Sequence, residues 1–356
     1  MKILQLIQKP QNRGAETFTC QLSKHLVKMG HEVRILAMFP GEAKLDWDQE
    51  IENIGGATGN RFLDYKAWKA LAKNIKDFQP DIVQANAGDT LKYAVLSKKI
   101  FGWKAPIIFR NASEVGQYLK TNFQKKFNSF LYRNVAGIVS VSEKSKKDLI
   151  YHFSFLEGKT IVIPIGLENK TTITAAKLGP AKHNIVHVGG FSFEKNHKGL
   201  LRIFIEVLHL KPDIHLHLIG DGPLKSKIEN LTRELKVEQN ITFYGFVNNP
   251  LDYIKSSDLL VLPSRIEGLP GVLLEAMYCK TPVIAYNVGG ISEIVNKTTG
   301  SLIEKDNETE FAKAIIKNLE HSNDSQIAEA HSMVSRKFMN EKLAKEFLKF
   351  YSKVIS

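Results

Sequence analysis

The stretch DLLVLPSRIEGLPGVLLE, residues 258–275, decides how the chain is interpreted. Its apolar start predicts a buried strand, and its apolar end predicts a helix. Gly268 and Gly271 allow the backbone to approach a ligand closely, and free N–H groups at a helix start favour an anionic or hydroxyl-rich partner. Glu275 follows Glu267 by about two helical turns. The two carboxylates can therefore hold separate parts of one extended ligand; the alternative is a glycine-containing turn with two solvated acids.

Short apolar runs alternate with helical patterns on both sides of this stretch. Before residue 170, strands are predicted at 2–7, 31–38, 80–85, 106–109 and 137–141, with a helix from Ala15 to Met29. In the second half, strands are predicted at 184–190, 214–220, 240–246, 258–264 and 282–287. Strands separated by helices imply parallel sheets with right-handed crossovers.

Residues 166–183 interrupt this alternation, because they are polar, rich in threonine and without periodicity. We interpret them as a linker. The sequence therefore predicts an α/β chain of two Rossmann-like domains, at 1–168 and 180–338. Ligands of such sheets bind at the carboxyl ends of the strands, so we expect a site in a cleft between the domains.

The charge is unevenly spread along the chain. The net charge is +12, and residues 1–170 hold 26 Lys and Arg against 16 Asp and Glu. Nucleic acid, an anionic membrane surface or an anionic substrate could each explain this excess. A solvated basic surface without a specific partner explains it equally well.

Cysteine content and hydropathy exclude several classes of protein. Cys20 and Cys279 are the only cysteines, which argues against a disulfide scaffold or a cysteine-based zinc site and fits a reducing cytoplasm. No stretch approaches the roughly 20 apolar residues of a membrane-spanning helix. The apolar run at 2–7 is too short for a signal peptide and is better interpreted as a first strand.

Several blocks of the sequence point together to one family. The longest, PSRIEGLPGVLLEAMYCKTPVIAYNVGGISEIV at 263–295, resembles the donor-site signature of the family 4 (group 1) retaining glycosyltransferases, which have the GT-B fold. Further similar blocks occur in the same order, at 13–16 (RGAE), 30–33 (GHEV), 141–149 (VSEKSKKDL), 161–168 (IVIPIGLE), 189–200 (GGFSFEKNHKGL), 220–229 (GDGPLKSKIE) and 243–250 (FYGFVNNP). The resemblance covers nearly the whole chain and implies that a C-terminal helix, 340–356, packs back on the first domain.

The resemblance also implies roles for individual residues. Glu267 would bind hydroxyls of the transferred sugar, and Glu275 would hold the ribose. Lys195 would pair with the diphosphate, where a fixed cation stabilises the departing negative charge. The N–H of Gly14 would meet the same phosphates. The rest of the implied donor site comprises Gly190, Phe246, Val247, Gly268, Leu269, Pro270, Gly271 and Leu274, with Phe246 and Val247 flanking the base.

Three departures from the family pattern affect these expectations. The family usually has an arginine where Gly190 stands, so we expect Arg265 or Lys198 to supply the missing charge. A histidine often lies near the reacting sugar in the first domain. The corresponding segments here are QANAG (84–88) and FRNAS (109–113), which make Asn86, Arg110 and Asn111 candidates for the acceptor side. Finally, IPIG at 163–166 replaces the more usual Asn-Gly.

The resemblance implies a retaining transfer of a hexose or N-acetylhexosamine from a nucleoside diphosphate, most simply UDP, to a hydroxyl of a glycan or lipid-linked acceptor. Synthesis of bacterial surface polysaccharide or lipopolysaccharide would fit. The nucleotide-sugar is a co-substrate, and neither a further cofactor nor a metal is expected. The motif at 46–48 (DWD) and the His215-x-His217 pair are not interpreted as metal ligands. No nucleic-acid-binding motif is found. An epimerase or phosphorylase of the same fold, and a non-enzymatic basic binding protein, remain alternatives.

A basic helix is predicted at 118–134. We expect its phenylalanines to pack on the first sheet. Its lysines could still attract anionic lipid, by about 1 kcal/mol each. Together with the charge of the first half, this predicts a cytoplasmic protein that contacts the inner face of a membrane peripherally.

Overall fold

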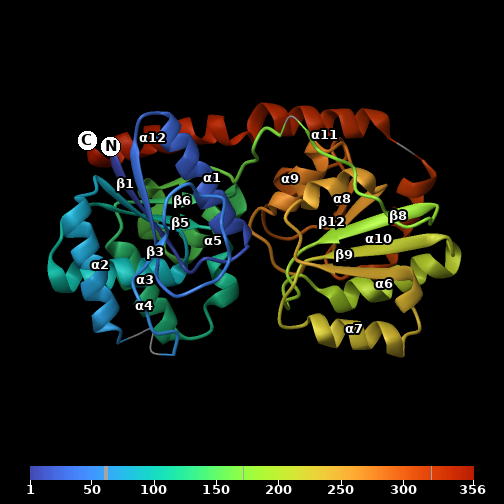
Figure 1. Ribbon diagram of the computed structural model, residues 1–356, viewed down its shortest axis with the longest axis horizontal. Coiled ribbons are helices and arrows are strands. Elements are labelled where there is room, and N and C mark those ends of the chain that lie inside the picture. Colours follow the sequence, from blue (N-terminus) through green and yellow to red (C-terminus); the bar gives the residue numbers. More distant parts are fainter. Residues whose placement is uncertain (60–62, 171, 322) are drawn as a thin grey trace. The chain divides into compact units, whose positions relative to one another are not determined.

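The computed structural model describes residues 1–59, 63–170, 172–321 and 323–356. The chain separates into two compact units (Figure 1). Unit 1 comprises Met1–Glu168 and Asn340–Ser356, and unit 2 comprises Asn169–Met339. Each unit is described by itself.

Unit 1 contains a seven-stranded parallel sheet in the order β3-β2-β1-β4-β5-β6-β7. Its strands are β1 (Lys2–Ile7), β2 (Glu32–Ala37), β3 (Glu52–Asn53), β4 (Ile82–Ala85), β5 (Ile107–Asn111), β6 (Gly137–Ser140) and β7 (Thr160–Val162). Its helices are α1 (Gly14–Lys28), α2 (Tyr65–Phe78), α3 (Gly88–Phe101), α4 (Asn122–Arg133), α5 (Glu143–His152) and α12 (Asn340–Ile355).

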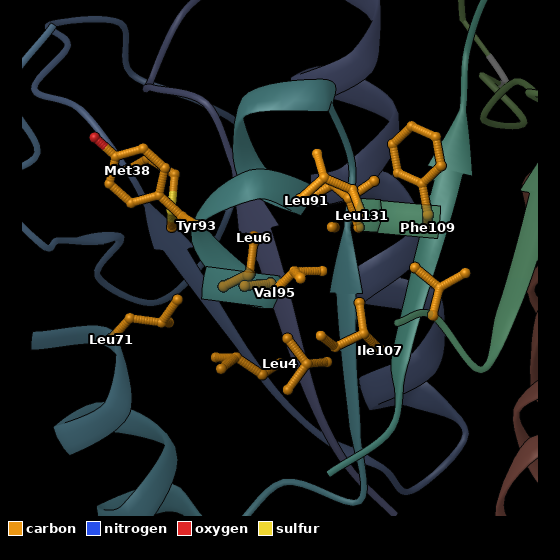
Figure 2. Close-up of a cluster of buried hydrophobic side chains, with 14 of the residues drawn as sticks. Leu4, Leu6, Met38, Leu71, Leu91, Tyr93, Val95, Ile107, Phe109 and Leu131 are labelled. Atoms are coloured by element: carbon orange, nitrogen blue, oxygen red, sulfur yellow. The ribbon is translucent and has the colours of Figure 1, made fainter. Parts of the chain in front are cut away.

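Alternate residues of β1 enter two different cores, because successive side chains of a strand point to opposite faces. Leu4 joins the cluster formed with α2 and α3, which Figure 2 shows together with Leu71 and Ile107. Ile3 faces the other cluster, which α1 and α12 cover. Burial on both faces explains why the strands are apolar runs rather than alternating ones.

The C-terminal helix α12 is part of unit 1. Phe347 contacts Phe18 of α1 with ring centroids 6.1 Å apart, and the Tyr351 hydroxyl donates a 2.6 Å hydrogen bond to Gln84 Oε1. At the start of the helix, Asn340 Nδ2 donates to Glu168 Oε1 at 2.6 Å. Apolar packing and buried hydrogen bonds thus hold the two ends of the chain together.

Unit 2 contains a six-stranded parallel sheet in the order β10-β9-β8-β11-β12-β13. Its strands are β8 (His183–Val188), β9 (Ile214–Ile219), β10 (Ile241–Gly245), β11 (Leu259–Leu262), β12 (Val283–Tyr286) and β13 (Ser301–Ile303). Its helices are α6 (His197–Leu210), α7 (Lys225–Glu234), α8 (Pro250–Ser256), α9 (Gly271–Tyr278), α10 (Glu308–Glu320) and α11 (Asp324–Lys337). The order of strands reverses between β8 and β11, and ligands of such sheets bind outside the carboxyl ends of the strands at this point.

The prediction for helix α4 was wrong in part. Phe123 is 71% exposed and Phe130 is 39% exposed, whereas Leu131 and Tyr132 are the buried residues of the helix. Only Phe127 packs partly against the core. The helix exists, but the side that faces the sheet lies about a third of a turn away from the phenylalanine column.

Candidate active site

Two loops meet at the point where the strand order of unit 2 reverses. β8 pairs directly with β11, with Val186 opposite Leu260, so the segments that follow them leave the sheet side by side. These segments are 189–196 after β8 and 263–270 after β11. The arrangement brings together two blocks that are about seventy residues apart in the sequence.

The two loops carry Lys195 and Glu267, which form an ion pair. Lys195 Nζ lies 2.6 Å from Glu267 Oε1, and the two side chains are 22% and 10% exposed. A short, charge-assisted hydrogen bond of this kind is stronger than a neutral one. The residues for which the family resemblance implies contact with the phosphate and with the sugar are therefore in direct contact with each other.

Backbone and amide hydrogen bonds fix the distance between these loops. The N–H of Arg265 donates to the carbonyl of Glu194 at 2.7 Å. Asn196 Nδ2 donates to the carbonyl of Pro263 at 3.1 Å. Asn196 has a φ of 55°, and its side chain accepts from the N–H of Gly199 at the start of α6. Asn196 thus caps a helix and joins both loops, a role that the sequence analysis missed.

A third loop, after β12, contacts the backbone of Glu267 and Gly268. The N–H of Gly290 donates to the carbonyl of Gly268 at 2.6 Å. Gly289 has a φ of 53°, and a Cβ atom placed on it would lie 2.0 Å from the carbonyl oxygen of Glu267. Only glycine fits this close approach without displacing the loop.

Glu275 lies on α9, with a partly buried side chain. Burial raises the pKa of its carboxyl group, and the nearby Lys170 ammonium opposes this shift. Loss of water around a carboxylate strengthens hydrogen bonds to it. Glu275 is therefore suited to accept hydrogen bonds from a pair of ligand hydroxyls.

The remaining residues of the implied donor site differ in accessibility. Gly190 and Phe246 are exposed, and Phe246 follows the carboxyl end of β10 with half of its surface accessible. Gly268, Leu269 and Pro270 are buried, so their backbone rather than their side chains is available to a ligand. Leu274 is fully buried in the core.

The two candidates for the missing cation differ in their surroundings. The Arg265 guanidinium lies 5.5 Å from the centre of the Phe193 ring, and its Nε atom is 3.6 Å from Asp306 Oδ1. Lys198 is exposed on the first turn of α6. Gly190 leaves open space in which a Cβ atom would meet only the carbonyl oxygen of Asp221, at 3.4 Å.

Two buried histidines beneath the loop after β8 were also missed. His187 Nδ1 lies 2.9 Å from the carbonyl of Val261 on β11, which makes it the donor. The His197 ring stacks on Phe191 with centroids 4.0 Å apart. Burial lowers the pKa of His187 to about 4 and that of His197 to about 2. Both rings are neutral at pH 7. For His187, the available signal was a polar residue within the apolar run NIVHV at 184–188.

The acceptor candidates of unit 1 are internal. Asn86 is 3% exposed and donates to Gln5 Oε1 at 2.9 Å. Arg110 is 2% exposed, lies over the Phe18 ring, and has its pKa lowered by burial to about 10. Asn111, also 2% exposed, donates to Ser140 Oγ. These three side chains support unit 1 from inside and offer no surface to an acceptor in this structure.

Other predicted features of unit 1 are accessible. Gly14 is exposed at the first position of α1. Asp46 and Asp48 both pair with Lys24. Over the described ranges, no group of three or more His, Cys, Asp or Glu side chains is placed to hold a metal ion.

The histidine pair of β9 belongs to a polar network within unit 2. His215 Nε2 lies 2.8 Å from Thr242 Oγ1 on β10. His217 lies between the Tyr244 hydroxyl and Asn184 Oδ1, both at 2.9 Å. The two histidines therefore belong to a hydrogen-bonded network on one face of the sheet.

Comparison with known proteins identifies the class to which this fold and site belong. Residues 12–169 match the family described as Glycosyltransferase Family 4, and residues 170–333 match Glycosyl transferases group 1. An uncharacterized glycosyltransferase of Haemophilus influenzae is 30% identical over 332 residues, which cover 85% of each chain. The chain belongs to the family 4 (group 1) glycosyltransferases and is a glycosyltransferase.

Two further comparisons bear on substrate and fold. An N-acetylgalactosaminyltransferase of Campylobacter jejuni, named for a diphospho-undecaprenol acceptor, is 27% identical over 271 residues, 72% of this chain and 73% of the relative. The crystal structure of Anabaena HepE in complex with UDP and glucose aligns with a TM-score of 0.81 at 19% identity, over 99% of this chain and 100% of HepE. The fold is GT-B. Family membership decides against a non-enzymatic basic binding protein.

Proposed function

We propose that the protein transfers a hexose or N-acetylhexosamine from a UDP-sugar to a hydroxyl of a glycan or lipid-linked acceptor, with retention at the anomeric carbon. The observation that carries this proposal is the Lys195–Glu267 pair, held at 2.6 Å where the strand order of unit 2 reverses. The bond that breaks joins the sugar to the phosphate. An adjacent cation and carboxylate can contact both groups, the cation the phosphate and the carboxylate the sugar.

Each residue has a chemical task in this proposal. Glu267 accepts hydrogen bonds from sugar hydroxyls, and Glu275 accepts those of the ribose. Lys195 stabilises the negative charge that develops on the departing diphosphate. The exposed Phe246 flanks the base together with Val247. In the bound state Lys195 lies between the carboxylate and the phosphate.

The ion pair also bears on the route of the reaction. A carboxylate that accepts a short hydrogen bond from an ammonium is a weak nucleophile, so Glu267 is suited to binding rather than to forming a covalent sugar ester. We therefore propose front-side attack by the acceptor hydroxyl, with the leaving phosphate accepting its proton. No metal is required in this scheme, because Lys195 supplies the positive charge.

The relatives support the choice of donor and acceptor. HepE was crystallised with UDP and glucose, and the Campylobacter relative is named for a diphospho-undecaprenol acceptor. The net charge of +10 in the first 170 residues fits an acceptor that carries phosphate. We place the enzyme in bacterial surface polysaccharide or lipopolysaccharide synthesis, in the cytoplasm and in contact with the membrane.

A hydrolysis screen of UDP-, GDP- and ADP-sugars, with and without EDTA, tests the donor. We expect release of UDP that EDTA does not change, and stabilisation against heat by UDP but not by single-stranded RNA. Preference for another nucleotide would overturn the choice of UDP, and conversion of the donor to its epimer without an acceptor would favour an epimerase. An inverted linkage in the product would exclude the retaining mechanism.

A separate experiment tests which residue supplies the charge of the family arginine that Gly190 lacks. We propose that Arg265 or Lys198 supplies the second phosphate charge, since both belong to elements that adjoin Lys195 in space or sequence. The double variant Arg265→Ala/Lys198→Ala should then bind UDP about 10- to 100-fold more weakly, because one charged hydrogen bond contributes about 1.5–3 kcal/mol. Unchanged affinity for UDP would exclude both residues.

A further inference from the structure

The imidazole ring of His187 is buried at the carboxyl end of β8, and its two nitrogens have different surroundings. Nδ1 lies 2.9 Å from the carbonyl oxygen of Val261 on β11, and a carbonyl oxygen can only accept. Nδ1 therefore carries the proton of the neutral ring, and Nε2 presents a lone pair. His187 is 0% exposed, and among the described residues Nε2 has no hydrogen-bond partner.

A buried acceptor without a donor is unusual, because its removal from water costs free energy that a hydrogen bond normally offsets. The packing of the ring does not explain the nitrogen: His187 meets the His197 ring edge-on, with centroids 4.8 Å apart. Burial lowers the pKa of His187 to about 4, so the lone pair is available at pH 7. The orphaned lone pair therefore indicates a donor that reaches it when the site changes its hydrogen bonds.

The end of the Lys195 side chain lies close to this lone pair, across Gly189. A Cβ atom placed on Gly189 would be 3.3 Å from His187 Nε2, 3.3 Å from Lys195 Cδ and 3.4 Å from Lys195 Cε. Because glycine lacks this atom, no side chain of residue 189 separates the ring from the lysine. Nζ is one bond beyond Cε, so rotation about the last bonds of the side chain can bring the ammonium to Nε2.

The backbone at Gly189 is fixed, which leaves this movement to the lysine side chain. The N–H of Gly189 donates to the carbonyl of Ile219 on β9 at 2.9 Å. Gly220 packs so closely that a Cβ atom on it would lie 2.2 Å from the carbonyl oxygen of Gly189. The start of the loop after β8 is therefore held in place between His187 and Lys195.

Lys195 has to change partners under the proposed function. Its ammonium now donates to Glu267 at 2.6 Å, whereas in the reaction Glu267 accepts from the sugar and the ammonium turns to the diphosphate. An ammonium has three N–H donors, so it can bind a phosphate oxygen and a further acceptor at once. A neutral imidazole suits this second position, because it orients the ammonium without neutralising the charge that stabilises the leaving group.

We propose that His187 is a positioning residue for Lys195: its Nε2 atom accepts a hydrogen bond from the ammonium when Lys195 leaves Glu267 for the diphosphate. The task of Lys195 at the diphosphate rests on the proposed function. The hydrogen bond between the two side chains does not, because loss of the Glu267 carboxylate alone is enough to free the lysine for it.

Nitrogen NMR of the histidine rings tests this hydrogen bond without any nucleotide. In Glu267→Ala the ammonium has lost its carboxylate, so the Nε2 resonance of His187 should move to lower frequency, as expected for an unprotonated ring nitrogen that becomes an acceptor. In Glu267→Ala/Lys195→Gln the resonance should return to its wild-type position. His187→Gln identifies the resonance by its loss. A resonance that does not move in Glu267→Ala would overturn the proposal.

Two substitutions of His187 separate positioning from stability. His187→Asn keeps an N–H donor near the position of Nδ1, for Val261, and removes the acceptor; His187→Gln places an amide oxygen near Nε2 and removes the donor. We expect His187→Asn to bind UDP about 3- to 10-fold more weakly, with unchanged affinity for uridine, as for the loss of one hydrogen bond. His187→Gln should bind UDP like the wild type although its melting temperature falls. Affinities for UDP that follow the melting temperatures would make the ring purely structural.

Gly189→Ala tests the same contact without changing the ring. The added methyl group would lie 3.3 Å from both Nε2 and Lys195 Cδ, so it should separate them and weaken binding of UDP as His187→Asn does. The matched control is His183→Asn, four residues earlier on the same side of β8 and only partly buried. This control should bind UDP like the wild type. Equal losses in His183→Asn and His187→Asn, or unchanged affinity in Gly189→Ala, would contradict the proposal.

The two measurements distinguish this inference from the proposed function. If the wild type does not bind UDP but the resonance moves in Glu267→Ala, the donor assignment fails and the hydrogen bond between Lys195 and His187 stands. If UDP binds through Lys195 but the resonance does not move, the proposed function stands and His187 has no positioning role.

Discussion

Lys195 donates a 2.6 Å hydrogen bond to Glu267 across 72 residues of sequence. The family resemblance implies different partners for these side chains, a phosphate and a sugar. The structure shows that each is the partner of the other. The charge that would attract the diphosphate is thus partly neutralised by the carboxylate that would hold the sugar, and this coupling leads to opposite expectations for the two residues.

Replacement of Glu267 by glutamine should separate binding of the nucleotide from transfer. We expect the rate of transfer to fall by about 10- to 100-fold, because hydrogen bonds to a charged group contribute about 1.5–3 kcal/mol. The affinity for UDP should stay the same or rise, since Lys195 is released from its counter-ion. Calorimetric titration with UDP beside initial rates gives both values. Glu234→Gln, on the exposed end of α7, is the control, and a parallel loss of UDP affinity in Glu267→Gln would contradict the coupling.

Replacement of Lys195 by glutamine should have the opposite effect on binding of UDP. We expect the affinity for UDP to fall by about 10- to 100-fold, whereas that for uridine, which lacks phosphate, should change little. The dependence of UDP binding on salt should also weaken, because one charge interaction with the diphosphate is lost. Fluorescence or calorimetric titrations at two salt concentrations measure this. Equal losses for UDP and uridine would show that Lys195 holds the fold of the loop rather than the diphosphate.

Gly289→Ala tests whether the loop after β12 positions Glu267. The added methyl group would lie 2.0 Å from the Glu267 carbonyl oxygen, at a φ of 53° that costs alanine about 1–2 kcal/mol. We expect kcat to fall by about 100-fold if the loop moves by roughly 1 Å, together with a lower melting temperature. Gly179→Ala, where a Cβ atom meets nothing within 4 Å, should leave both unchanged. A lower melting temperature with an unchanged kcat would make Gly289 purely structural.

The buried histidines should make unit 2 sensitive to acid. The pKa values of His187 and His197 are lowered in the folded state, to about 4 and about 2, so the unfolded chain binds more protons below its own pKa of about 6.5. Their contribution to stability is complete above pH 6.5 and is lost as the pH falls toward the folded values. The slope is at most about 1.4 kcal/mol per pH unit for each histidine.

Urea unfolding of the wild type and of His197→Phe between pH 4 and 7 checks this. Phenylalanine keeps the stacking on Phe191 and cannot be protonated, so the variant should lose less stability over this range. His321→Phe, at an exposed position after α10, is the control and should follow the wild type. Parallel curves for wild type and His197→Phe would contradict the prediction.

Much of the fold could be predicted from the sequence, because burial on both faces turns parallel strands into continuous apolar runs. All ten predicted strands exist, and the C-terminal helix expected at 340–356 corresponds to α12 (Asn340–Ile355). The strands that were missed, Glu52–Asn53, Thr160–Val162 and Ser301–Ile303, have two or three residues at the sheet edges. Such short segments have no periodicity to detect.

Prediction of the site was less complete, for a physical reason. The spacing of Glu267 and Glu275 is local, since a turn and a helix of fixed rise connect them. The sequence by itself determined this spacing, and it predicts that both residues belong to one site. The contact of Lys195 with Glu267 depends on the pairing of β8 with β11, and only the tertiary structure decided it. The same holds for α4. Its helical period can be predicted from the sequence, but the sequence does not show which side of the helix meets the sheet. That side, and therefore which phenylalanines face water, depends on how Leu131 and Tyr132 anchor the helix in the core.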